Sequence, residues 1–179
     1  NLSADWTVPA VAFNPANANT YNMAKQSVVY DSLGTQHTVS QYFVKSAAGV
    51  TVHYGFDGAV PATSTAMTFN AQGQLTAPVA PVALTLTPTN GAAALAFTVD
   101  YTGTTAFAGE AITSTNATDG YASGAFVGVE LAPDGSIIAK YSNDQNQAIA
   151  TLAVATFADE GSLASISDTS WGETASSGV

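Results

Sequence analysis

Short runs in which apolar and polar residues alternate recur along the chain, separated by turns rich in Gly, Pro and Asn. The run from Val50 to Phe56 places its apolar residues on one face of an extended strand and His53 on the other, because successive strand side chains point to opposite sides. Residues 82–86 and 95–99 alternate in the same way. Several short strands at turn-rich spacing predict an all-β fold, with a β-barrel or a β-sandwich as its main body.

Two β-hairpins are predicted where alternating runs flank turn-forming residues. Their strands and turns are residues 27–30, 31–34 and 37–45 for the first hairpin, and residues 125–131, 133–135 and 136–141 for the second. Residues 148–157 are ambiguous, because Ala and Leu favour a helix whereas Ile, Thr, Val and Phe favour a strand. We predict a strand there.

A change in composition divides the chain. Residues 102–118 are rich in Thr, Ala, Gly and Ser, and the turn-like pair Asp119-Gly120 then introduces a second group of predicted strands. We therefore predict two β-domains. Residues 1–118 form the barrel or sandwich, and residues 119–179 form a smaller antiparallel domain.

The charge composition limits the partners of the chain. Three lysines, no arginine and 13 acidic residues give a formal net charge of −10, which offers little to neutralise phosphates. Neither nucleic acid nor a membrane is therefore an expected partner. Without cysteine there are no disulfides and no thiolate metal sites. The N-terminal sequence lacks the basic and apolar parts of a signal peptide, so we expect either a fragment or another export route.

Only His37 and His53 can supply an imidazole base for nucleophilic catalysis, which also needs a hydroxyl or thiol and an orienting group. Asp31 and His37 flank one predicted turn, so a dyad is geometrically feasible. A triad would need a serine from elsewhere, and no Gly-x-Ser-x-Gly elbow is present. We interpret Asp31 and His37 as polar positions near a hairpin. We predict no catalytic residues and no enzyme activity.

Oxygen ligands for calcium would have to come from Asp134, Asn143 and Asp144 across the second hairpin, but no Asp-x-Asp-x-Asp-Gly loop exists. Phosphate loops, dinucleotide fingerprints and His-Glu-x-x-His motifs are also absent from the sequence. Trp6 and Trp171 could belong to a sugar-stacking platform, although packing in a core or interface is the favoured interpretation. We predict no metal and no cofactor.

Several segments resemble, in the same order, segments of bacterial flagellar hook proteins. The longest reads Ser-Val-Val-Tyr-Asp-Ser-Leu-Gly-Thr-Gln-His at residues 27–37, and Tyr21-Asn22 precedes it. Together the segments cover nearly the whole chain. The others are residues 41–45, 69–75, 119–124, 134–136, 141–143, 157–158, 161–163 and 173–178, with Trp171.

This resemblance implies a structural subunit of the curved, flexible tube that joins the flagellar motor to the filament and transmits torque as a universal joint. It implies that residues 1–118 are an outer β-domain and residues 119–179 the returning half of the adjacent domain. The expected partners are neighbouring hook subunits, the expected location is extracellular after export without a cleaved signal peptide, and the isolated chain is expected to be monomeric. Two alternatives are a secreted carbohydrate-binding or adhesin β-module and a β-sandwich hydrolase.

Overall fold

The computed structural model describes residues 1–178 and divides into two compact units, the first spanning Asn1–Ser123 and the second beginning at Gly124. Nearly all regular structure is β-strand, which confirms the predicted all-β class. Helix is limited in the described part of the chain to two single 3-10 turns, η1 (Ala18–Thr20) and η2 (Glu160–Ser162). None of the described helices is long and apolar enough to cross a bilayer.

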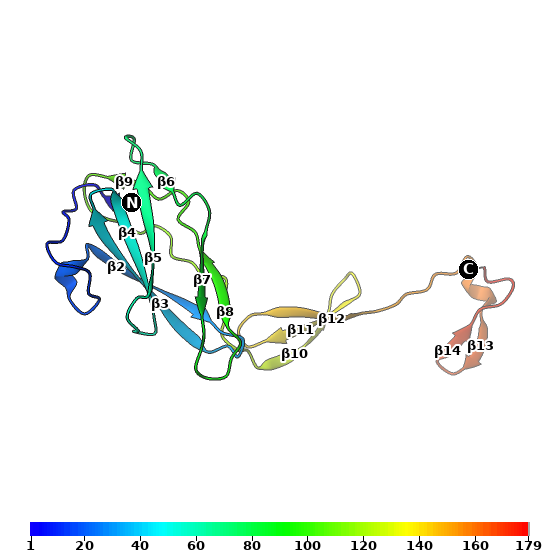
Figure 1. Ribbon diagram of the computed structural model, residues 1–179. Helices are drawn as coiled ribbons and strands as arrows, with labels where there is room; N and C mark the ends of the chain where they lie inside the picture. The colour runs from blue at the N-terminus through cyan, green and yellow to red at the C-terminus, as the bar shows by residue number, and fades with distance from the viewer. Residues whose placement is uncertain (179) are drawn as a thin grey trace. The chain divides into compact units, whose positions relative to one another are not determined.

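A five-stranded antiparallel sheet forms the body of unit 1 and curls into a half-barrel (Figure 1). The strand order in the sheet follows the order in the sequence, as expected for strands joined by short turns. The strands are β2 (Met23–Tyr30), β3 (Gln36–Ser46), β4 (Gly49–Phe56), β5 (Thr63–Phe69) and β6 (Leu75–Ala77).

The alternating pattern of β4 is borne out by its burial. Val50, Val52 and Tyr54 are at most 2% exposed and lie on one face, with Met67 of β5 paired to Val50 at 0% exposure. His53 lies on the opposite face and is only partly buried. The predicted apolar face is therefore the core face of the half-barrel.

A separate hairpin, β7 (Val82–Leu86) with β8 (Leu95–Val99), adds its apolar face to this core. Its Leu84 belongs to the same buried cluster as Phe43 and Val52. Both strands coincide with the alternating runs predicted at residues 82–86 and 95–99. A short parallel pair, β1 (Leu2–Ser3) with β9 (Ala106–Phe107), brings the N-terminus against the later part of unit 1.

Unit 2 contains a three-stranded antiparallel sheet of β10 (Phe126–Leu131), β11 (Ser136–Tyr141) and β12 (Asn146–Thr151). The second predicted hairpin is β10–β11. A two-stranded hairpin follows, formed by β13 (Ala164–Ser167) and β14 (Ser170–Gly172).

The strand predicted for residues 148–157 is right only as far as Thr151. Thr151 pairs with Ser136, the first residue of β11, and the last backbone bond runs from Leu152 to Gly135 in the preceding turn. Beyond Leu152 the neighbouring strand offers no further backbone partners. The strand therefore ends although the sequence keeps its β-forming residues.

Candidate functional site

A cluster of polar side chains lies at one end of unit 1, centred on His37 of β3, which is 8% exposed. Its Nδ1 lies 2.7 Å from Asp57 Oδ2 and its Nε2 lies 3.1 Å from Asp31 Oδ2. Asn90, in the turn between β7 and β8, donates to the same Asp31 oxygen at 2.7 Å. One imidazole thus bridges two carboxylates that come from different connections.

Hydrogen bonds from nearby backbone N–H groups position the carboxylates of Asp31 and Asp57. Asp31 follows β2 directly, and its Oδ1 accepts from the backbone N–H groups of Leu33 and Thr35 at 2.8 and 2.9 Å, as an Asp at the start of a tight turn does. Asp57 follows β4 with φ of 47°, and its Oδ1 accepts from Thr38 N–H at 2.8 Å. Each carboxylate therefore leaves its Oδ2 for His37.

The electrostatics of the cluster favour the charged forms. Hydrogen bonds to Asp57 and then to Asp31 raise the pKa of His37, outweighing its burial. The Asn90 amide holds the pKa of Asp31 well below its usual value, with His37 and the turn N–H groups adding to the effect. Burial of Asp57 acts in the opposite direction, but the bonds from Thr38 and His37 leave its pKa lowered. The arrangement is that of an imidazolium between two carboxylates.

This geometry does not suit catalysis. A general base must offer a free ring nitrogen to the substrate, yet both nitrogens of His37 face carboxylates. Because Asp31 and Asp57 bind opposite nitrogens, the three groups do not converge on one metal position. Among residues 1–178 no group of three His, Cys, Asp or Glu side chains is placed to hold a metal ion.

His53 lies on the other face of the sheet and packs against the N-terminal segment. Its ring stacks on Phe13 with centroids 4.1 Å apart and planes 11° apart. Tyr42 and Tyr21 extend this aromatic cluster, with 5.1 Å between their centroids. Partial burial lowers the pKa of His53. The two histidines therefore lie on opposite faces and form no common site.

The residues considered for calcium are separated by the length of β11. Asp134 lies in the turn before that strand and its Oδ1 accepts from Ser136 N–H at 3.0 Å. Asn143 and Asp144 lie in the turn after it, where Asn143 Oδ1 accepts from Gln145 N–H at 3.3 Å and Asp144 has φ of 59°. These side chains shape two different turns.

The two tryptophans occupy different environments. Trp6 is partly buried and packs against the core of unit 1. Trp171 lies on β14 in unit 2 and is 63% exposed. They are thus in separate units, and neither unit by itself contains both.

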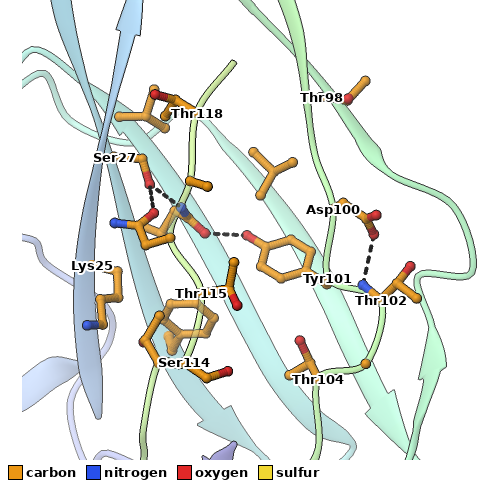
Figure 2. A pocket seen from close by; sticks show the side chains of 18 of the residues that line it. Lys25, Ser27, Thr98, Asp100, Tyr101, Thr102, Thr104, Ser114, Thr115 and Thr118 are labelled. Atoms are coloured by element: carbon orange, nitrogen blue, oxygen red, sulfur yellow. Dashed lines mark hydrogen bonds between the residues drawn. The ribbon is translucent and has the colours of Figure 1, made fainter. Parts of the chain in front are cut away.

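A groove of about 730 Å³ opens beside β2 and β3 (Figure 2). Its polar groups largely bond to one another: Tyr101 Oη donates to Gln41 Oε1 at 2.6 Å, and Ser27 Oγ donates to Asn116 Oδ1 at 2.7 Å. Asn116 Nδ2 also donates to the backbone oxygen of Gln26 on β2. The two bonds of Asn116 hold the segment around that residue against β2, an edge strand of the sheet.

Sequence reasoning identified Asp31 and His37 as neighbours of one turn but missed Asp57 and Asn90. Both precede a glycine, which marks them as turn residues. Asp57 reaches His37 through the register of β3 with β4, and Asn90 reaches Asp31 from the β7–β8 turn 59 residues away, and no local signal reveals either contact. In the structure Asp31 and His37 belong to one bridge of three side chains, which His37 forms between Asp31 and the half-exposed Asp57.

Comparison with known proteins identifies the family. Residues 1–121 match the model of the flagellar basal body protein FlaE D2 domain. The whole chain aligns with the flagellar hook protein FlgE of Escherichia coli K12 and with that of Salmonella typhimurium LT2, at 32% identity in each case and over 46% of each relative. The chain thus spans about half the length of the curated relatives it matches.

A solved structure, the flagellar hook protein FlgE2 of Helicobacter pylori, matches with a TM-score of 0.50 at 16% identity, covering 80% of this chain and 34% of that one. The curled antiparallel sheet and this match show an all-β fold of the kind seen in that structure. The chain belongs to the family of flagellar proteins with the FlaE D2 domain, whose model covers its first 121 residues, and it is similar over its whole length to flagellar hook proteins. The carbohydrate-binding or adhesin alternative is not favoured by these matches.

Proposed function

We propose that this chain is part of a structural, non-enzymatic subunit of the bacterial flagellar hook, the flexible joint that transmits motor torque to the filament. The observation that carries the proposal is the alignment of the entire chain, in both units, with flagellar hook proteins at 32% identity. The proposed location is extracellular, on the flagellum, after export without a cleaved signal peptide. The proposed partners are neighbouring hook subunits.

The polar surface suits such a role. Only 9% of the residues are charged, against about 25% in an average domain. Subunits in a tube that bends while it rotates must slide past one another, which small polar contacts permit better than large apolar ones. The abundance of Thr, Ser, Asn and Gln supports this proposal.

We further propose that residues 1–118 are the outer domain and residues 119–179 one half of an adjacent domain. Support comes from the sheet of unit 2, where Val127, Val129, Leu131 and Ile149 are all at least 54% exposed. Ala139, at 2% exposed, is the one fully buried apolar residue in the described part of this unit. Three short strands with uncovered apolar side chains need further protein to cover them.

Replacement of the matching region of a full-length hook protein by this chain tests the proposal. The chimera is expressed in a motile bacterium that lacks its own hook protein, and the cell surface is imaged by electron microscopy. Curved hooks are the expected result. A chimera that is exported and folded but leaves the cells without hooks would overturn the proposal, provided that the unmodified full-length protein restores hooks in the same cells.

A further inference from the structure

Three connections of unit 1 meet at His37, although they are far apart in the sequence. The β2–β3 turn contributes Asp31, the end of β4 contributes Asp57, and the β7–β8 turn contributes Asn90 through its bond to Asp31. A second contact joins the β2–β3 turn to the β7–β8 turn, because Ala93 N–H donates to Ser32 Oγ at 3.1 Å. The imidazole is thus the centre of the bonding at this end of the half-barrel.

We propose that His37 is a protonation-dependent clamp, which ties these three connections together as an imidazolium and releases one of them when it loses its proton. The imidazolium has two N–H donors and satisfies both carboxylates at once. Neutral imidazole has a single N–H, so one ring nitrogen then turns a lone pair toward a carboxylate. Loss of the proton therefore breaks one of the two contacts.

Burial indicates which contact is lost. The side chain of Asp31 is 0% exposed, whereas that of Asp57 is 48% exposed. A buried carboxylate left facing a lone pair costs more than one that water can reach. Asp31 therefore keeps its bond to Nε2–H, and Asp57 separates from Nδ1 into solvent.

The charged groups around the imidazole ring determine how strongly it holds its proton. The charged groups that contact the ring are Asp31 and Asp57, and the β7–β8 turn contributes the neutral amide of Asn90. Both carboxylates stabilise the protonated form of His37 and so raise its pKa. Stability from the clamp is fully present below the unfolded-state pKa of about 6.5 and is lost as pH rises through the higher pKa of the folded state.

The turn that Asp31 bonds to His37 packs against the last residue of unit 1. A Cβ built on Gly34, in the clamped turn, would lie 2.5 Å from the backbone nitrogen of Ser123, so the turn backbone is packed tightly against that residue. Ser123 is the last residue of unit 1. Because Asp31 keeps this turn bonded to His37, release of Asp57 is expected to free the end of β4 and to leave the packing of the turn against Ser123 in place.

Nitrogen-15 NMR of the histidine rings in the 179-residue chain tests the proposal directly. The titration midpoint of His37 is expected above 6.5, and both of its ring nitrogens are expected to carry protons at pH values below that midpoint. The Nε2–H tautomer is expected at high pH. His53, whose pKa is lowered by burial, serves as the internal control and titrates below 6.5. A His37 whose titration midpoint is at or below 6.5, or that keeps Nδ1–H when neutral, would overturn the proposal.

Denaturation by urea between pH 6 and pH 10 gives a second test. The denaturation midpoint of the wild-type chain is expected to fall with rising pH, and this fall is expected to shrink in His37→Gln while persisting in the control variant His53→Gln. Because His37→Gln alters a buried residue, Asp57→Asn provides a milder variant at a half-exposed side chain. Asp57→Asn should lower the titration midpoint of His37, because it removes one of the two carboxylates that stabilise the imidazolium. An unchanged midpoint in a folded Asp57→Asn variant would contradict the clamp.

Discussion

Tyr54 and Tyr101 bring two phenol groups into the core of unit 1, and their hydroxyls differ in how they are satisfied. Tyr101 is 8% exposed and donates to Gln41 Oε1, and burial raises the pKa of its phenol. Tyr54 is 1% exposed, and its hydroxyl lies near the phenol of Tyr101, whose pKa it helps to raise, but makes no hydrogen bond of good geometry among the described residues. An unpaired buried hydroxyl carries a desolvation cost without a compensating bond.

Removal of each hydroxyl should therefore have opposite effects. Tyr54→Phe keeps the packed ring and removes the unpaired group, so we expect the free energy of unfolding to rise by about 1 kcal/mol. The matched variant Tyr101→Phe breaks the bond to Gln41 and should lower it by about 1 kcal/mol. Urea denaturation followed by tyrosine and tryptophan fluorescence measures both. A clear loss of stability in Tyr54→Phe would mean that its hydroxyl has a partner.

At the scale of elements, the sequence was most informative where burial alternates and least informative where pairing is distant. The faces of β4 and the positions of β7 and β8 follow from alternation alone. The parallel pair β1–β9 joins residues more than 100 positions apart, such as Leu2 and Ala106, and no periodic signal marks it. The contact of His37 with Asp57 depends on the register between β3 and β4, which alternation does not fix, so the sequence indicated only the proximity of His37 to Asp31.

The backbone conformation of Gly34, in the turn between β2 and β3, can be tested by substitution. Gly34 has φ of 75°, and Gly58 has φ of 78°, but only Gly34 is packed against other atoms. Gly58→Ala should cost about 1 kcal/mol for the left-handed conformation alone. Gly34→Ala should cost at least about 2 kcal/mol, because its methyl group would also meet Ser123. Equal losses in the two variants, measured by urea denaturation, would show that the contact with Ser123 is easily relieved.

At the scale of the whole molecule, the two units differ in how much they bury. Unit 1 has a continuous apolar cluster that includes Phe43, Val52 and Met67. The strands of unit 2 are mostly exposed, and β12 is exposed along its full length. This contrast is consistent with a chain whose second unit packs against further parts of a longer hook protein.

Hydrogen exchange should show the same contrast. In the isolated chain, amides of β10–β12 are expected to exchange far faster than those of β3 and β4, because local opening of a sheet without a core costs little free energy. In a full-length hook protein that contains this chain, protection of β10–β12 should rise while that of β3 and β4 stays similar. Strong protection of β10–β12 in the isolated chain would contradict the proposed half-domain.

The central claim, that this chain forms part of the flagellar hook, is tested most directly by immunogold electron microscopy of cells that express it. Antibodies raised against residues 1–123, the unit proposed to include the outer domain, are applied to intact cells. The account predicts gold particles along the short curved segment between the cell surface and the filament. Labelling of the cell body or the filament, with the hook left unlabelled, would contradict it.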